Sequence, residues 1–205
     1  MDRSTPYHLP HSTHVAGYAV IYGGDDRFVG NIFLDGDAAL AYGPAAEGKA
    51  PAGYGTAGYN GHPASFEEYL ARIYEQPQGD HQRFIGVKQP VYIRENFYIA
   101  EAHAFKGESN RLLLDETATA VLVDEGDEVY LDAQLPDAFG RATVGVVSGQ
   151  DLKRVRFVDA DFEERDGTPA VMDVDLLGDR KSPGKSYPAG PIAALISGAS
   201  RLRVW

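Results

Sequence analysis

Two adjacent carboxylates, Asp25 and Asp26, are the residues of this chain best suited to acid and base chemistry. They follow Gly23 and Gly24 and precede Arg27. Glycosidases that retain configuration need two carboxyl groups roughly 5 Å apart, and inverting ones need roughly 6.5 to 9.5 Å, separations that neighbouring turn residues can reach. Arg27 would tune the pKa of one of them. The alternative is ordinary turn chemistry, in which Gly-Gly-Asp-Asp forms a corner and Arg27 pairs with one carboxylate.

The histidines at the start of the chain form a second candidate group. His8, His11 and His14 fall at three-residue intervals. Pro6 and Pro10 argue against a helix there, and in an extended segment three-residue steps alternate between faces, so the three rings do not converge on one ion. We therefore expect His11 and His14 to have a structural or substrate-facing role, and we expect neither a metal nor another cofactor.

Tyrosines in a segment rich in glycine, alanine and proline could bind sugar rings. Tyr42, Tyr54 and Tyr59 lie in residues 35–63, which we predict to be a long ordered loop. Aromatic rings are suitable platforms for the C–H faces of sugars. The alternative is that they pack the loop against the core.

A fourth group combines charged and imidazole side chains in strand-like sequence. Glu95, Glu101 and His103 lie close together near Asn96. If they point outward they line a groove; otherwise they belong to a solvated sheet face.

Composition and missing motifs exclude several function classes. The net charge of -11 and the pI near 4.9 argue against nucleic acid and anionic membranes as partners. The chain contains no cysteine, and no phosphate loop, nucleophile elbow or H-E-x-x-H motif is present. The first ten residues lack a signal-peptide pattern. We expect a cytoplasmic protein as the sequence is written, or an extracytoplasmic one if it was cut from a longer exported protein.

The elements that must position these residues are mostly strands. Residues 14–22 and 27–34 are predicted strands separated by the turn at 23–26. A helix is predicted to begin at Ser65, where Ser65 and Glu68 match a capping box. The remaining predicted strands are 84–87, 91–93, 97–99, 111–114, 118–123, 128–135, 142–147, 155–158, 171–176 and the C-terminal 201–205.

The fold class predicted from this pattern is all-β, with one helix. Residues 1–80 are expected to form short β-helix-like coils, a long loop and one amphipathic helix. Residues 81–205 are expected to form an antiparallel β-sandwich domain, because turn residues recur between short strands at sandwich-like spacing. Within it, residues 124–127 are a predicted hairpin turn and 180–191 a surface loop.

Several segments resemble the C-terminal portion of right-handed parallel β-helix proteins of the glycoside hydrolase type, the fucosidase- and xylanase-like group of polysaccharide-degrading bacteria. The segments are PHSTHVAG, GGDDRFVGNIFL, SFEEYLARI, VKQPVYIRENFYI and DGTPAVMDVDLLG with RLRVW. The resemblance implies a β-helix before these segments and a β-sandwich after the last coils. It also implies a carbohydrate-active module whose partner is a polysaccharide or oligosaccharide.

Two functions remain open at this point. In the first, the module acts on a glycan, with Asp25 and Asp26 as acid and base. In the second, a non-catalytic module binds glycans or caps a β-helix, and it self-associates or associates with a partner through an exposed coil end. The residues predicted to contact substrate are Arg27, His11, His14, Tyr42, Tyr54, Tyr59, Glu95, Glu101 and His103.

Overall fold

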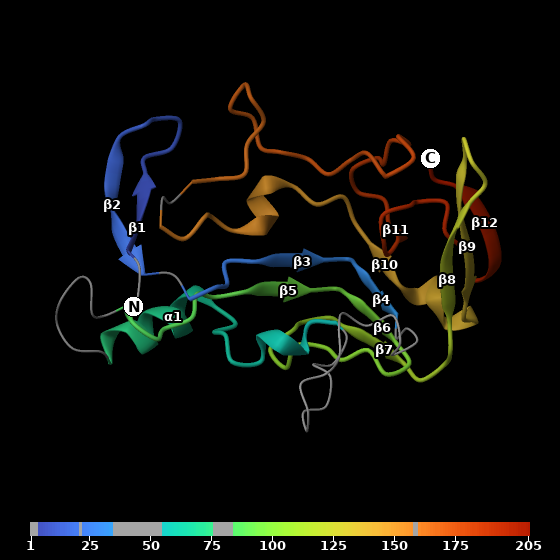
Figure 1. The fold of residues 1–205 in the computed structure, drawn as a ribbon, viewed down its shortest axis with the longest axis horizontal. Helices are drawn as coiled ribbons and strands as arrows, with labels where there is room; N and C mark the ends of the chain where they lie inside the picture. The colour runs from blue at the N-terminus through green and yellow to red at the C-terminus, as the bar shows by residue number, and fades with distance from the viewer. Residues whose placement is uncertain (1–3, 21, 35–54, 76–83, 158–159) are drawn as a thin grey trace. The chain divides into compact units, whose positions relative to one another are not determined.

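The structure is a computed structural model that describes residues 4–20, 22–34, 55–75, 84–157 and 160–205. The described residues form mostly strands, in small open sheets of two or three strands, with a single α-helix among them (Figure 1). The predicted all-β class is therefore confirmed. In the same described residues, no helix is long and apolar enough to cross a membrane.

The chain divides into two compact units, and each is built from three separate segments. Unit 1 comprises Met1–Arg27, Gly61–Ile93 and Val147–Val171, and unit 2 comprises Phe28–Asn60, Arg94–Val146 and Met172–Trp205. Both units thus take segments from before and after residue 80. The division into domains 1–80 and 81–205 stays a prediction.

Unit 1 begins with an antiparallel hairpin. Strand β1 (Ser4–His8) pairs with β2 (Val15–Val20), and the register shifts at the end where His8 faces Val15. A strand was predicted at 14–22, but as part of a parallel coil. The prediction of a strand is confirmed, whereas the parallel pairing is wrong, because the segment before Pro10 is itself a strand and supplies an antiparallel partner.

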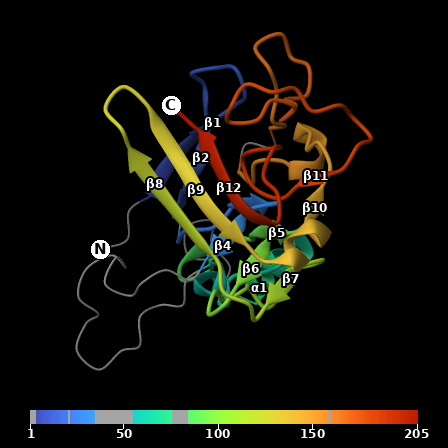
Figure 2. The ribbon, with the colours of Figure 1, turned by 90° about the vertical axis from the view of Figure 1, so that its right-hand side faces the viewer.

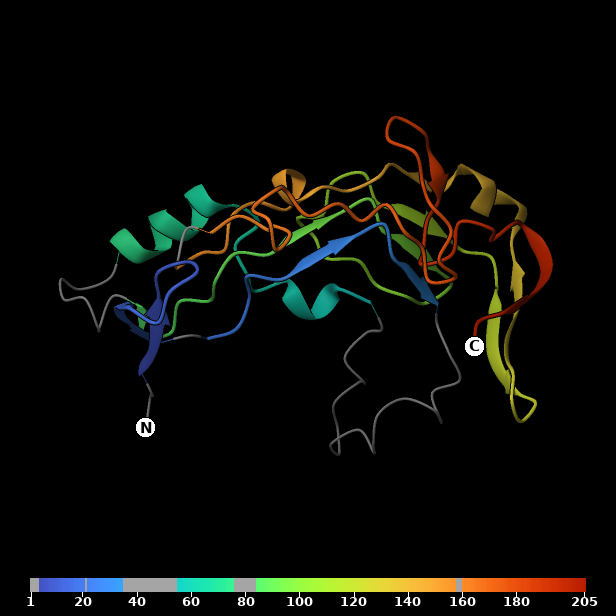
Figure 3. The same ribbon diagram turned by 90° about the horizontal axis from the view of Figure 1, so that it is seen from above.

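The helix of unit 1 is α1 (Phe66–Tyr74), whose start agrees with the predicted cap. The Ser65 hydroxyl accepts a hydrogen bond from the Glu68 backbone N–H at 3.1 Å. The Glu68 carboxylate accepts from Ala64 N at 2.8 Å, one residue earlier than a capping box requires. Figure 3 shows α1 as a regular helix. The buried side chains of α1, Tyr69 and Ile73, form a small apolar cluster with Val87 and the partly buried Phe84.

Unit 2 contains a parallel ladder of three short strands. These are β4 (Ile32–Leu34), β6 (Phe97–Ile99) and β7 (Leu112–Leu114), with Ile32 beside Phe97 and Phe97 beside Leu112. Two further strands of three residues, β3 (Arg27–Val29) and β5 (Tyr92–Arg94), pair with each other and precede β4 and β6 in the chain.

The three strands of the ladder share one kind of corner. Two residues before each strand lies a residue with positive φ: Gly30 (68°), Glu95 (58°) and Asn110 (57°). Glycine and asparagine adopt this left-handed conformation readily, but glutamate does so at a cost of about 1 kcal/mol. At Gly30 a Cβ would also come within 2.9 Å of Val144 Cγ1, so this corner needs glycine for space as well.

A buried polar network joins the first two corners of the ladder. The Asn96 side-chain oxygen accepts from Asn31 N at 2.8 Å and from Asn31 Nδ2 at 2.9 Å. Glu108 accepts from the Asn96 side chain at 2.8 Å and from the Tyr98 hydroxyl at 2.6 Å. Burial and then the hydrogen bond to Glu108 raise the pKa of Tyr98, so its phenol stays neutral. Thr56 completes the network, with its hydroxyl 2.6 Å from the Tyr98 oxygen.

The second sheet of unit 2 is antiparallel. Strand β9 (Val129–Leu135) lies between β8 (Thr119–Asp124) and β12 (Gly198–Arg203), as Figure 2 shows. The predicted hairpin turn lies between β8 and β9, where Gly126 has a φ of 87°. The C-terminal strand was also predicted, and its pairing with β9 confirms it.

The core of unit 2 is apolar and draws on both sheets. Phe97 of the parallel ladder meets Phe139 edge-on, with ring centroids 5.6 Å apart. Other members are Ile99, Leu114, Ala133, Leu135, Ala142, Ala189, Ile192 and Leu195.

The remaining elements are short. They are β10 (Thr143–Val144), β11 (Tyr187–Pro188) and the 3-10 helices η2 (Ala57–Tyr59), η4 (Asp137–Arg141) and η5 (Gly149–Leu152). Strand β11 lies inside the predicted surface loop 180–191 and pairs with β10. The predicted strand 84–87 is a turn instead, and 155–158 and 171–176 contribute only isolated bridges at Val155, Val171 and Val174. Neither a complete β-helix nor a sandwich is established by these sheets.

Candidate functional site

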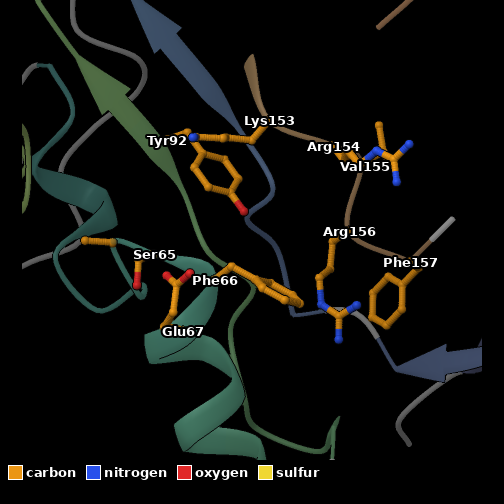
Figure 4. Close-up of a pocket in the computed structure, with 10 residues that line it drawn as sticks. Ser65, Phe66, Glu67, Tyr92, Lys153, Arg154, Val155, Arg156 and Phe157 are labelled. Atoms are coloured by element: carbon orange, nitrogen blue, oxygen red, sulfur yellow. The ribbon is translucent and has the colours of Figure 1, made fainter. Parts of the chain in front are cut away.

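Unit 1 contains a half-open cleft of about 740 Å³ beside the start of α1. We call it the unit 1 cleft. Figure 4 shows the aromatic, basic and acidic side chains that surround it. The lining residues are Ala64, Ser65, Phe66, Glu67, Tyr92, Lys153, Arg154, Val155, Arg156 and Phe157.

The first turn of α1 supplies one wall. Because Ser65 caps the helix, Phe66 and Glu67 are held in fixed positions at its first turn. Phe66 remains 39% exposed. The backbone N–H of Glu67 and then the Ser65 hydroxyl lower the pKa of the Glu67 carboxyl, with a further contribution from the charge of Lys153. This wall therefore presents an aromatic ring and a carboxylate that is ionised at neutral pH.

The opposite wall is a short basic segment that Arg27 holds in place. Arg27 donates from Nε to Leu152 O at 2.9 Å and from Nη2 to Arg154 O at 2.8 Å. Between these two carbonyls, Lys153 has φ 62° and ψ 157°. That conformation is nearly restricted to glycine and costs about 1–3 kcal/mol in any other residue. The guanidinium of Arg27 thus holds Lys153 in a strained conformation at the edge of the cleft.

Asp25 connects Arg27 to the same segment. Its Oδ1 lies 2.7 Å from Arg27 Nη1, an ion pair without hydrogen-bond geometry, and the Arg27 side chain is only 9% exposed. Its Oδ2 accepts from the Arg156 backbone N–H at 3.0 Å. A half-buried carboxylate with these two contacts compensates the charge of Arg27 and fixes the course of the basic segment. Both contacts make Asp25 a positioning residue for the cleft wall.

Arg156 is surrounded by aromatic rings. Its guanidinium carbon lies 5.0 Å from the centroid of Phe66, 4.7 Å from that of Tyr69 and 5.1 Å from that of Phe157. Such contacts fix a cation with little loss of its charge. Burial raises the pKa of Tyr69, against the opposing effect of Arg156, so the phenol remains neutral beside it.

Tyr92 and Arg154 complete the cleft in different ways. Arg27 lies over the Tyr92 ring at 4.8 Å, and burial followed by the charge of Asp25 raises the pKa of Tyr92. Arg154 forms a two-pronged ion pair with Asp161, with Nε to Oδ1 at 3.0 Å. The charge of Arg154 is thus largely compensated, whereas Lys153 and Arg156 face the cleft with Glu67 as the one acidic lining residue.

The arrangement is suited to binding a flat polar ligand. Aromatic faces, a lysine, a stacked arginine and one carboxylate offer both apolar contact and charge-assisted hydrogen bonds. Within the described residues, no group of three or more histidines, aspartates or glutamates could hold a metal ion.

The predicted catalytic residues differ in their surroundings. Asp25 makes the two contacts described above. The Asp26 backbone carbonyl accepts from Tyr92 N at 2.9 Å, and its half-buried carboxylate has no ion pair or hydrogen bond among the described residues. Neither aspartate lines the unit 1 cleft. Their catalytic role stays a prediction.

None of the predicted substrate-binding residues in the described part of unit 1 lines the cleft; Arg27 contacts the segment that forms its wall, and the two histidines lie elsewhere. His11 is exposed, and its Nε2 lies 3.1 Å from Glu163 Oε2. His14 is also exposed, and its backbone N–H donates to the Ser12 hydroxyl at 2.9 Å. The structure therefore does not bring these histidines together with Asp25.

The predicted residues of unit 2 are not gathered into one site either. Tyr59 packs against Phe28 at 5.5 Å, which agrees with the alternative that it packs against the core. Glu95 occupies a corner and forms an ion pair with Arg94. His103 and Glu101 are exposed, and His103 contributes its backbone carbonyl to Thr56 and Ala57. Tyr42 and Tyr54 lie outside the described residues.

Sequence reasoning missed the cleft residues Phe66, Glu67 and Tyr92 and also a basic segment. Lys153, Arg154 and Arg156 belong to LKRVRF, whose last three residues lie in the predicted strand 155–158. Three basic residues within four positions of an acidic chain were a usable signal. Its connection to Arg27 depends on folding, because about 125 residues separate them.

One solved structure provides a close comparison. A structure of XylC in complex with xylose matches this chain with a TM-score of 0.80 and 43% sequence identity. The chain is similar to part of XylC. The match covers 99% of this chain but 30% of the XylC chain, so this chain spans about a third of that protein's length. No protein-family model and no curated protein sequence matches this chain.

Proposed function

We propose that this chain is a carbohydrate-active module that binds a xylose-containing glycan in the unit 1 cleft. The observation that carries the proposal is the likeness to XylC, which was solved with xylose, at 43% identity over 99% of this chain. The cleft supports it because Phe66 and Tyr92 offer ring faces to a sugar, while Glu67 and Lys153 offer charged hydrogen-bond partners.

The finer part of the proposal is a relationship to β-helix glycoside hydrolases. Its support is the parallel ladder β4-β6-β7, where three strands stack in register behind three left-handed corners. Such stacking is the elementary unit of a parallel β-helix. Association of the ladder edge with further coils, in a longer chain or a second copy, belongs to the same proposal. Light scattering at micromolar concentration tests the second copy, and a strictly monomeric species contradicts it.

Binding is favoured over catalysis by the contacts of Asp25. A general acid or nucleophile has to reach the glycosidic bond. Both carboxylate oxygens of Asp25 instead contact other groups of the protein, Arg27 and the Arg156 backbone N–H. The second candidate function, glycoside hydrolysis by Asp25 and Asp26, is supported by the carboxylate of Asp26, which has no ion pair or hydrogen bond among the described residues.

Binding and hydrolysis can be tested on the same samples. Calorimetry with xylobiose and xylotriose measures binding, with cellotriose as the control sugar, and release of p-nitrophenol from its β-xyloside measures turnover. We expect binding of the xylo-oligosaccharides to be weakened by Tyr92→Ala. Absence of binding contradicts the proposal. Loss of turnover in Asp26→Asn supports glycoside hydrolysis as the function. Unchanged turnover in both Asp25→Asn and Asp26→Asn excludes these residues as catalysts.

A further inference from the structure

Positive charge is concentrated at the unit 1 cleft of a strongly acidic chain. The whole chain carries a net charge of -11. Arg154 is paired with Asp161, but the cleft lining still contains two further basic residues, Lys153 and Arg156, against one acidic lining residue, Glu67. A neutral oligosaccharide needs hydrogen bonds and ring faces but no excess of cations. The excess therefore indicates a ligand that carries negative charge.

The two cations that face the cleft, Lys153 and Arg156, are both held in energetically unfavourable arrangements. Lys153 keeps a backbone conformation that favours glycine, and Arg27 maintains it through the carbonyls on both sides. Arg156 is fixed between Phe66, Tyr69 and Phe157, and its buried Nε has no hydrogen-bond partner. Strained or under-satisfied groups are retained where a binding site needs them, and here both kinds belong to the same wall.

The aromatic residues of the same cleft indicate a sugar as the carrier of that charge. Phe66 and Tyr92 provide flat apolar faces within the same hollow as the cations. A carboxylate can accept parallel hydrogen bonds from a guanidinium and an ion pair from a lysine. A free inorganic anion uses the cations alone and gains nothing from the rings.

We propose that the unit 1 cleft recognises a uronic acid, with Lys153 and Arg156 binding its carboxylate and the aromatic residues binding its ring. This inference rests on the proposed function and specifies its ligand as an acidic, xylose-containing oligosaccharide. Arg27 and Asp25 act as positioning residues, because they hold the segment that carries both cations.

The test compares two ligands that differ in one acidic group. Calorimetry in low salt measures the affinity for xylotriose that carries a glucuronic acid branch and for unbranched xylotriose. We expect the acidic ligand to bind about tenfold more tightly, which is the scale of one charge-assisted hydrogen bond. In about 0.5 M salt the preference should fall below about threefold, because exposed charges are then screened.

Matched variants connect the preference to Lys153. Lys153→Gln should remove most of the preference, whereas Lys88→Gln removes the same charge from an exposed site of unit 1 outside the cleft and should retain it. Lys153→Gly should also lose the preference while raising the unfolding temperature, since glycine tolerates this conformation. The gain in stability shows that the lost preference does not come from unfolding.

Each remaining outcome has a definite meaning. Equal affinity for the two xylotrioses, or an unchanged preference in Lys153→Gln, overturns the uronic acid inference and leaves glycan binding intact. Free glucuronate or inorganic phosphate binding as tightly as the branched ligand overturns it as well, in favour of a general anion site. If neither oligosaccharide binds, the proposed function itself fails.

Discussion

Each of the two units is stabilised internally by a different kind of contact. In unit 2, two three-stranded sheets contribute to a continuous apolar core that includes Phe97 and Phe139. Unit 1 has a small apolar cluster around Tyr69, and much of its remaining organisation depends on Arg27 and Arg156 contacting carbonyls, a carboxylate and aromatic rings. Apolar side chains that pack together leave little space between them, whereas the contacts of the two arginines leave space for a cleft. The unit with fewer packed apolar residues is thus the one that contains the candidate binding cleft.

The largest effect should come from breaking the core of unit 2. Phe97→Ala removes a ring that is 1% exposed and in contact with Phe139, so we expect the free energy of unfolding to fall by about 3–5 kcal/mol. Urea denaturation measures it. Hydrogen exchange with mass spectrometry then shows whether peptides of unit 2 lose protection before those of unit 1. Leu113→Ala, at a position 54% exposed in the same ladder, should change stability by less than about 0.5 kcal/mol.

A close backbone contact is the corresponding weak point of unit 1. At Gly149 an added Cβ would lie 2.0 Å from Phe162 O, so Gly149→Ala should cost about 2–3 kcal/mol through displaced backbone. Peptides of unit 1 should then exchange faster. Gly145→Ala is the control, because nothing lies within 4 Å of its added Cβ. Equal stability of the two variants would refute the contact.

A pH-dependent contribution to stability is expected in unit 2. Burial alone would raise the pKa of Asp175, but the backbone N–H groups of Ala193, Asp179 and Leu177 outweigh it and lower the pKa below its usual 3.8. The stabilisation is therefore complete above about pH 4 and is lost as pH falls through the lowered value. Asp175→Ala should lose about 1–2 kcal/mol at pH 7 and little at pH 2.5. Urea denaturation at both pH values measures the difference, and a constant difference would contradict it.

The smallest effect concerns the helix that forms one wall of the cleft. Ser65→Ala removes the acceptor for Glu68 N and should reduce stability by about 1 kcal/mol. It should also weaken glycan binding, because Phe66 and Glu67 are held by the first turn of α1. Thermal unfolding and calorimetry measure the two effects. Ser65→Asp retains the acceptor and should behave like the original chain in the unfolding experiment.

Local patterns predicted the elements whose determinants lie within a few residues. The cap of α1 depends on Ser65 and Glu68, and the β8-β9 hairpin depends on the turn around Gly126. The strand expected at 97–99 matches β6 residue for residue. In contrast, β1 was not predicted. Pro6 and Pro10 argued only against a helix there, and an edge strand tolerates proline.

Long-range contacts explain what could not be predicted about the site. Asp25 and Arg27 were identified from the sequence as a reactive group, yet Arg27 donates to carbonyls of residues 152–154, and Asp25 accepts from Arg156 N. No local pattern indicates which distant segment a buried arginine will bind. The sequence therefore drew attention to these residues, whereas their contacts depend on the fold.

The repeated corners of the parallel ladder have a consequence for how this fold can vary. Strands β4 and β6 are joined by a long segment that includes α1, whereas β6 and β7 are joined by a short one, yet both pairs have the same register. The corners at Gly30, Glu95 and Asn110 fix where each strand enters. The connecting segments are thus free to lengthen, shorten and diversify without disturbing the ladder. Related proteins with the same ladder can therefore differ in their insertions without a change of register.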